Sequence, residues 1–230
     1  MIKIHQVMDD KRTIIIADDH PLFRTALQQA IGQAFGDCNI HEAGSLDDLQ
    51  QKLENTENTD LLLLDLQMPG TFGYSGLIFI REHYPQLPII IVSGNEGPAT
   101  VHQCLQCGAA GFIAKSLALP EMAHALATID RGEVWMPENA RTVRPEPNPE
   151  RQDMARILGS LTPQQYRVLS YMAQGLLNKQ IAYEMDLSIS TVKAHMTSIL
   201  KKFGMFRRTQ IVAAMKQLDL EELEQPQNSG

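Results

Sequence analysis

The hydrophobic residues in the first half of the chain fall into short runs separated by longer periodic segments. Five runs are rich in β-branched residues or leucine: Thr13–Ala17, Asn39–Ala43, Leu61–Leu64, Ile89–Val92 and Gly111–Ala114. Four of them are almost continuously apolar, which is typical of strands buried on both faces of a parallel sheet. The pattern therefore predicts five strands, most of them buried.

The segments between these runs carry apolar residues at helical spacing. Three such faces are Leu22, Ala26, Leu27 and Ile31; then Leu46, Leu49 and Leu53; and later Met122, Ala125, Leu126 and Ile129. Strands that alternate with helices form βαβ units. The first half therefore has the pattern of an α/β fold, a doubly wound parallel sheet with helices on both faces.

The pattern changes at Pro137. Four prolines follow within residues 137–158, and proline continues neither a helix nor a central strand. We interpret residues 137–158 as an extended linker with a helical end near Arg151–Leu158. It joins a first domain, residues 11–136, to a second domain, residues 159–222, whose pattern is all helical.

Helix starts in the second domain are marked by capping residues. Thr162 before Pro163 starts one helix, and a second, short helix covers Asn178–Met185. A tight turn then leads to a third helix over Ile189–Phe203, with Ser188 as its N-cap. A helix, a tight turn and a further helix suit insertion into a DNA major groove.

The third helix has two different faces. Val192, Met196, Ile199 and Phe203 share one face and are expected in the core, whereas Lys193, Ala194 and Thr197 face outward, with Lys201 one turn further on. The cations expected to meet DNA phosphates are Lys179, Lys201, Lys202, Arg207 and Arg208. On periodicity alone, a small helical bundle with solvated lysines is an equal alternative.

Charge is distributed unevenly along the chain. The net charge is -7, but residues 1–140 carry 8 Lys and Arg against 18 Asp and Glu, whereas residues 159–216 carry 8 against 2. This asymmetry indicates a basic module that binds a polyanion. The three cysteines lack the spacing of a disulfide framework, which indicates a reducing compartment. No apolar run reaches the roughly 18 residues that a membrane span needs, and the N-terminus has no signal-peptide pattern. These features predict a cytoplasmic protein that does not enter a membrane.

Polar residues follow the predicted strands at one edge of the sheet, where ligands of open α/β sheets bind. They are Asp18 and Asp19 after the first strand, Asp65 after the third, Ser93 at the end of the fourth and Lys115 after the fifth. Three neighbouring carboxylates require a hard cation such as Mg²⁺, beside which a carboxylate can attack a phosphoryl group. Each residue alone is compatible with a solvated cap, so the prediction depends on the whole set.

Four segments resemble the signature motifs of response regulator receiver domains: DDHPLFR, LLLDLQMPG, IIIVSG and GFIAKS. The resemblance implies a flavodoxin-like (CheY-like) sheet with the strand order 2-1-3-4-5. It also implies that Asp65 is the phospho-acceptor. Mg²⁺ would be held by Asp18, Asp19, Asp65 and the backbone carbonyl of Gln67.

The same resemblance assigns further roles and shows two departures, one of which is Ser116, where many receivers have proline after the lysine. Ser93 and Phe112 match the switch positions, and Lys115 matches the phosphate-binding lysine. The loop after Asp65 reads MPGTFGYSGL, which has more residues than the usual MPGMDGL and contains Phe72 and Tyr74. This loop puts kinase docking and the rate of autodephosphorylation in doubt more than phosphorylation itself.

The second domain resembles the LuxR/NarL-type (FixJ-type) helix-turn-helix through NKQIA, STVKAH and ILKKFG. The resemblance implies that Ile189–Phe203 is the recognition helix and that Lys193, Ala194 and Thr197 face bases. His195 would lie near the DNA backbone or pack inside the domain. The segment Thr209–Met215 matches the dimerisation helix, and Gln164-Gln165 replaces the family's usual Arg-Glu.

Together these features predict a DNA-binding response regulator of a two-component system and not an enzyme. A sensor histidine kinase would phosphorylate Asp65, and the protein would then form a homodimer on a two-fold site in double-stranded promoter DNA. We further hypothesise that the resting receiver domain covers the recognition helix and releases it on phosphorylation.

Two other functional classes remain open. Phosphatases of the haloacid dehalogenase type also use acids on such a sheet, but with a D-x-D motif after the first strand, where this chain has two adjacent acids. Multiple turnovers of small phosphate esters would identify that class. A receiver controlled by protein contact or a small ligand, without phosphorylation, is the other alternative.

Overall fold

The computed structural model describes residues 11–56, 58–142 and 149–223. The expectations for the N-terminal segment 1–10 and for linker residues 143–148 lie outside the described residues. The strands are β1 (Thr13–Ala17), β2 (Asn39–Ala43), β3 (Leu61–Leu64), β4 (Ile89–Ser93) and β5 (Gly111–Ala114). The helices between and after them are α1 (Pro21–Phe35), α2 (Leu46–Asn55), α3 (Ser75–His83), α4 (Pro98–Gln106) and α5 (Leu119–Asp130).

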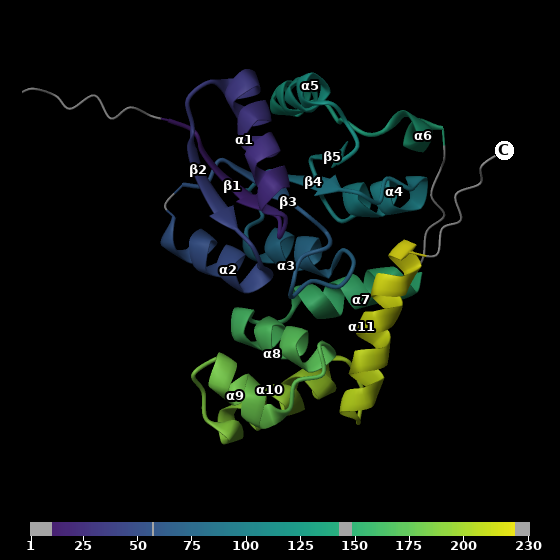
Figure 1. The fold of residues 1–230 in the computed structure, drawn as a ribbon. Coiled ribbons are helices and arrows are strands. Elements are labelled where there is room, and N and C mark those ends of the chain that lie inside the picture. Colours follow the sequence, from purple (N-terminus) through teal and green to yellow (C-terminus); the bar gives the residue numbers. More distant parts are fainter. Residues whose placement is uncertain (1–10, 57, 143–148, 224–230) are drawn as a thin grey trace, which may run out of the picture.

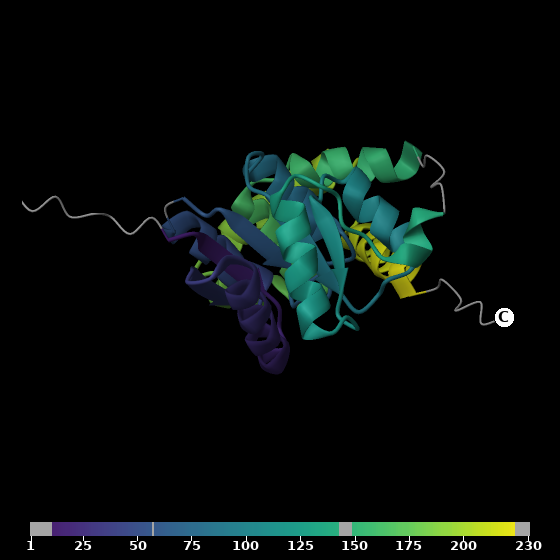
Figure 2. The same cartoon turned by 90° about the horizontal axis from the view of Figure 1, so that it is seen from above.

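The five strands form one parallel sheet in the order β2-β1-β3-β4-β5. Alternate residues of each strand enter two separate apolar clusters, with Ile14 and Ile16 on one face and Ile15 and Ala17 on the other. α1 and α5 cover the first face, and α2, α3 and α4 cover the second (Figures 1 and 2). The predicted doubly wound, flavodoxin-like sheet is confirmed.

One residue of the predicted helical faces is exposed, and Ala26 is half-buried. Leu22 was expected in the core with Leu27 and Ile31, but its side chain is 89% exposed. Packing of α1 against α5 buries the helix only from Leu27 onward. Leu22 lies in the first turn of α1, before that contact begins, and lines an open depression beside Lys115.

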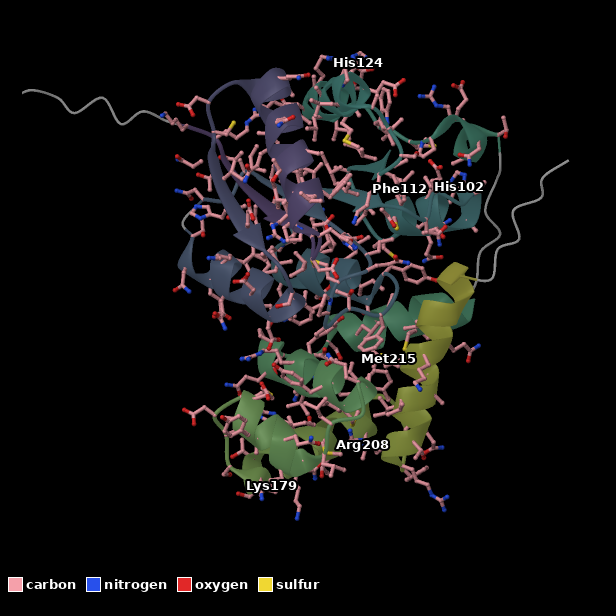
Figure 3. The ribbon with its side chains drawn as sticks, in the orientation of Figure 1. His102, Phe112, His124, Lys179, Arg208 and Met215 are labelled. Carbon is pink, nitrogen blue, oxygen red and sulfur yellow. The ribbon has the colours of Figure 1, made fainter. Side chains whose placement is uncertain are left out.

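The predicted linker contains two helices, α6 (Glu138–Arg141) and α7 (Pro149–Gly159), so its described part is more helical than expected. Two of its prolines stand where a helix tolerates them: Pro137 is the N-cap of α6, and Pro149 is the first residue of α7. α6 packs on α4, where His102 Nε2 donates to the Ala140 carbonyl over 2.7 Å (Figure 3). α7 packs along α3.

The second domain contains α8 (Pro163–Ala173), α9 (Asn178–Glu184), α10 (Ile189–Lys202) and α11 (Arg208–Leu223). The predicted caps are present: the hydroxyl of Thr162 accepts from the backbone N–H of Gln165, and that of Ser188 accepts from Thr191. Val192, Ile199 and Phe203 of α10 are buried as expected, whereas Met196 is half-buried. Among the described residues, no helix combines the length and apolar character needed to span a membrane.

The two domains share one apolar cluster. It begins on the α2–α4 face of the sheet and continues through α7 and α8 into the second domain, which lies below that face in Figure 1. Across the boundary, the rings of Phe79 in α3 and Tyr166 in α8 lie 4.5 Å apart between centroids. Contact between the domains is therefore made by α8, and α10 lies further from the sheet.

Candidate functional site

The carboxyl ends of three strands bring two buried carboxylates and a lysine together. Asp18 follows β1 and Asp65 follows β3, and these strands pair so that Ala17 lies beside Leu64. Lys115, which follows β5, places its Nζ 2.7 Å from Asp18 Oδ2 and 2.8 Å from Asp65 Oδ2. The expected clustering of these residues at one edge is therefore observed.

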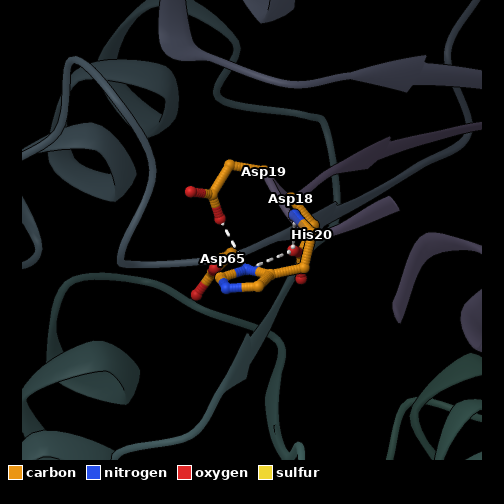
Figure 4. Close-up of side chains that lie close together, drawn as sticks. All are labelled: Asp18, Asp19, His20 and Asp65. Atoms are coloured by element: carbon orange, nitrogen blue, oxygen red, sulfur yellow. Dashed lines mark hydrogen bonds and ion pairs between the residues drawn. The ribbon is translucent and has the colours of Figure 1, made fainter. Parts of the chain in front are cut away.

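A histidine joins the acidic cluster. One ligand atom from each of Asp18, Asp19, His20 and Asp65 lies within 4.8 Å of all the others (Figure 4). His20 Nδ1 is 2.6 Å from Asp19 Oδ1 and 3.3 Å from Asp18 Oδ1. The sequence predicted no metal-binding role for His20, although its position directly after the acid pair was a signal.

The donor atoms of this cluster suit a hard divalent cation. Three carboxylates converge, Asp18 and Asp65 are almost fully buried, and Lys115 supplies only one positive charge against them. Mg²⁺ prefers a few carboxylate oxygens together with carbonyl oxygens and water. The carboxylates present therefore fit Mg²⁺, and they need no nitrogen ligand from His20.

Burial and charge pairing have opposite effects on the pKa values of Asp65 and Lys115. Burial raises the pKa of the Asp65 carboxyl, and the hydrogen bonds from Lys115 and from the Gln67 N–H only partly offset it. Burial alone would lower the pKa of Lys115, but its hydrogen bonds to Asp18 and Asp65 outweigh that effect and raise it. Lys115 therefore remains charged beside the acceptor carboxylate.

The two expected switch residues occupy different surroundings. Ser93 ends β4 at the acidic edge, where its Oγ accepts from the Asn95 N–H and its carbonyl accepts from the Lys115 N–H. Phe112 is fully buried in β5, on the face covered by α2–α4. Its N–H donates to the Trp135 carbonyl over 2.8 Å, which ties it to the segment that leads into α6 (Figure 3).

The outward face of α10 is free of contact with the first domain. Lys193, Ala194, Thr197 and Lys201 are exposed, as are Lys179 in α9 and Arg207 before α11. The hypothesis that the receiver covers the recognition helix is therefore wrong for this structure. The reason lies in the side chains: α8 offers the large apolar Tyr166 to the receiver, whereas the outward face of α10 is polar or small.

Of three further residues expected to contact DNA, two form hydrogen bonds within the second domain and the third is half-buried. Lys202 Nζ donates to the Ser160 carbonyl at 2.5 Å and to Gln165 Oε1 at 2.8 Å. The guanidinium of Arg208 donates to the carbonyls of Met172 and Leu176 (Figure 3). His195 Nε2 is shielded and has no hydrogen-bond partner among the described residues, which favours packing.

The Gln164-Gln165 departure has a structural counterpart. Gln165 Nε2 donates to Ser198 Oγ at 3.0 Å, and its Oε1 accepts from Lys202. A neutral amide side chain, bonded to Ser198 and to the Lys202 ammonium, thus stands where the family usually has a charged residue. In α11, Ile211, Met215 and Leu218 are buried, which leaves the opposite face for the dimer contact that remains a prediction.

Comparisons with known proteins agree with this architecture. Residues 14–127 match the family described as "Response regulator receiver domain", and residues 159–215 match "Bacterial regulatory proteins, luxR family". The "Glycerol metabolism activator" of Pseudomonas putida is 37% identical over 213 residues, covering 90% of this chain and 96% of that protein. The "Nitrate/nitrite response regulator protein NarL" of Escherichia coli K12 is 33% identical over 201 residues, covering 86% and 92%.

A solved structure extends the likeness to the whole chain. RcsB from Salmonella enterica serovar Typhimurium, bound to the promoter P1flhDC in the presence of the phosphomimetic BeF3-, matches with a TM-score of 0.54 and 25% identity, covering 91% of this chain and 99% of that one. These relatives are regulators of transcription and not enzymes, so the comparisons do not support the phosphatase alternative. The chain belongs to the family of two-component response regulators that carry a LuxR-type (NarL-type) DNA-binding domain.

Proposed function

We propose that phosphorylation of Asp65 by a sensor histidine kinase controls dimerisation of this chain and its binding to double-stranded promoter DNA. The observation that carries the proposal is the buried Asp65 carboxylate beside Asp18 and the Lys115 ammonium. A buried acceptor with a neighbouring acid pair and a fixed cation is what phosphoryl transfer to a carboxylate requires.

Mg²⁺ is proposed to bind Asp18, Asp19, Asp65 and the backbone carbonyl of Gln67. When bound, it neutralises charge that develops on the phosphoryl oxygens. Asp65 attacks the phosphorus, the P–N bond of the kinase phosphohistidine breaks, and its electron pair remains on the histidine nitrogen. Lys115 and the Ser93 hydroxyl then hold the phosphoryl oxygens, and Phe112 repacks with Ser93.

DNA binding is assigned to the outward face of α10. Lys193, Ala194 and Thr197 are exposed together, which suits contact with base edges, and Lys179, Lys201 and Arg207 are exposed for phosphate contacts. Lys202 and Arg208 form hydrogen bonds inside the domain, so their contact with phosphates remains a prediction. A dimer through α11 would present two such helices to a site of two-fold symmetry.

The test combines sedimentation and DNA binding on the purified full-length chain with Mg²⁺. Each is measured with and without a beryllium fluoride complex, which mimics the phosphoryl group, for wild type and for Asp65→Ala. We expect the complex to dimerise wild type and to tighten its DNA binding, and to leave the variant unchanged. Equal DNA binding by both proteins, with and without the complex, would show that the receiver is controlled without phosphorylation.

A further inference from the structure

The loop between β3 and α3, residues 66–74, contacts the acidic site at one end and the second domain at the other. Near its start, the N–H of Gln67 donates to Asp65 Oδ1 over 3.1 Å. Directly after its end, Ser75 Oγ lies 2.6 Å from the phenolic oxygen of Tyr166 in α8. Only nine residues, 66–74, lie between Asp65 and Ser75, so the loop is a short covalent connection between the two places.

A buried threonine makes the first half of this loop rigid. Thr71 Oγ1 lies 2.7 Å from the carbonyl of Leu66 and 2.8 Å from that of Met68, and it accepts from the Met68 N–H at 3.1 Å. The residues on both sides of Gln67 are therefore bound to one side chain. A Cβ on Gly76, in the first turn of α3, would lie 2.8 Å from Thr71 Cγ2, so the start of the helix packs tightly against the Thr71 side chain.

The second half of the loop is bound to α8. Ser75 Oγ accepts from the Phe72 N–H at 2.9 Å and is joined to Tyr166 on its other side. The side chain of Tyr166 is buried, and burial raises the pKa of its phenol, so the hydroxyl keeps its proton. Gly70 adopts a φ of +97°, and a Cβ there would lie 3.3 Å from Ser170 Oγ, so α8 also approaches the loop backbone closely.

We propose that Tyr166, although it belongs to the DNA-binding domain, is a positioning residue for the metal site of the receiver. By holding Ser75 it restrains the loop, and the restrained loop keeps the Gln67 carbonyl where a cation held by Asp18 and Asp65 requires it. The inference rests on the proposed Mg²⁺ site. It gives the unusual loop a role, which is to connect that site to α8.

Coupling of this kind acts in both directions. If docking of α8 increases the affinity for the cation, then binding of the cation stabilises docking of α8 by the same free energy. Loss of the Tyr166 hydroxyl frees the loop to sample conformations that do not bind the cation. Only molecules whose loop is in the binding conformation bind the cation, so the apparent affinity for the cation is proportional to the fraction of molecules in that conformation.

The test measures binding of Mn²⁺, a stand-in for Mg²⁺, to the full-length protein by electron paramagnetic resonance of the free ion, with Mg²⁺ as competitor. Tyr166→Phe removes only the hydroxyl and keeps the ring on Phe79. We expect it to weaken Mn²⁺ binding about five-fold, at the low end of measured coupling between sites. Tyr171→Phe is the matched control. It also removes a hydroxyl from α8 at the domain interface, but that hydroxyl binds Asp47 and not the loop. We expect wild-type affinity for it, because Arg167 still binds Asp47 and keeps α8 docked.

Two further measurements separate positioning from a general loss of structure. In a Ser75→Ala background, Tyr166→Phe should cause no additional loss of affinity, because its hydroxyl acts through Ser75. Mn²⁺ should also slow hydrogen exchange in α8 of wild type and of Tyr171→Phe, but much less in Tyr166→Phe. A full additional loss in the Ser75→Ala background would contradict the proposal.

The outcomes distinguish this inference from the proposed function. If wild type binds Mn²⁺ and Tyr166→Phe binds it as tightly as Tyr171→Phe does, Tyr166 does not position the site, and the proposed phosphorylation site stands. If wild type binds no Mn²⁺, or Asp65→Ala binds it equally well, the proposed metal site fails and this inference fails with it.

Discussion

Lys115 is the residue on which the charge balance of the acidic site depends. Its ammonium is within 2.8 Å of carboxylate oxygens from both Asp18 and Asp65, and those two carboxylates are almost fully shielded from water. Removing one partner of a buried ion pair leaves an uncompensated charge, which is more costly than never having had the pair. In the receiver, a bound cation can replace that lost charge.

Substitution Lys115→Ala should therefore destabilise the metal-free protein by about 2–3 kcal/mol, less than for a fully buried pair because the lysine is partly exposed. Urea unfolding in EDTA and in Mg²⁺ measures this. We expect Mg²⁺ to stabilise the variant more than it stabilises wild type, because the ion takes over the charge compensation. An equal effect of Mg²⁺ on both proteins would argue against a cation among these carboxylates.

At the scale of the element, α10 divides its cations between two tasks. Lys201 is exposed on the outward face, whereas Lys202 is bound to Ser160 and Gln165 inside the domain. Both were candidates for DNA contact on their charge. Helical periodicity assigns each residue to a face, but it does not show which distant groups fill the space beside the last turn.

This difference predicts that two variants that lose the same charge differ in their effects: one changes DNA binding and the other changes stability. Lys201→Ala should weaken binding to duplex DNA and reduce the slope of log affinity against log salt by about 1, with unchanged stability. Lys202→Ala should leave the salt slope near wild type and lower the stability of the domain by about 1 kcal/mol. Fluorescence anisotropy over a series of salt concentrations, together with thermal unfolding, measures both. Identical salt slopes for the two variants would remove the distinction.

At the scale of the whole molecule, a polar cluster borders the apolar contact between the domains. Asp47, in the first turn of α2, accepts hydrogen bonds from the Arg167 guanidinium at 3.0 Å and from the Tyr171 hydroxyl at 2.7 Å. Burial and the neighbouring Asp47 raise the pKa of Tyr171 to about 12, so its hydroxyl stays a donor at any physiological pH. Asp47 therefore anchors α8 to the receiver at a second place, in addition to Ser75.

Substitution Asp47→Asn should weaken docking of the second domain by about 1–2 kcal/mol, because charged hydrogen bonds become neutral in a partly exposed place. Hydrogen exchange in α8 should become faster, and α10 should be unaffected. Asp153→Asn, which breaks an exposed ion pair with Arg156 within α7, is the matched control and should change neither. Unchanged exchange in α8 of Asp47→Asn would show that the apolar contact alone holds the domains together.

Local hydrophobic periodicity and helix-capping residues were enough to predict most of the elements. Continuous apolar runs indicated four of the five strands, and Thr162 and Ser188 marked helix starts that the structure confirms. Strand ends also located the acidic site, because parallel strands bring their carboxyl ends to one edge whatever the details of packing. These inferences hold because each depends on neighbours in the chain or on one topological rule.

Only the tertiary structure decided which faces of these elements meet. The contact of Tyr166 with Ser75 joins residues 91 positions apart, and nothing local to either residue indicates the other. For the same reason the sequence suggested that α10 docks on the receiver, whereas α8 does, and it did not reveal that Lys202 and Arg208 are held inside the domain. A side chain's local pattern determines the element and the face it occupies. Its partner depends on the free energy of packing the whole chain.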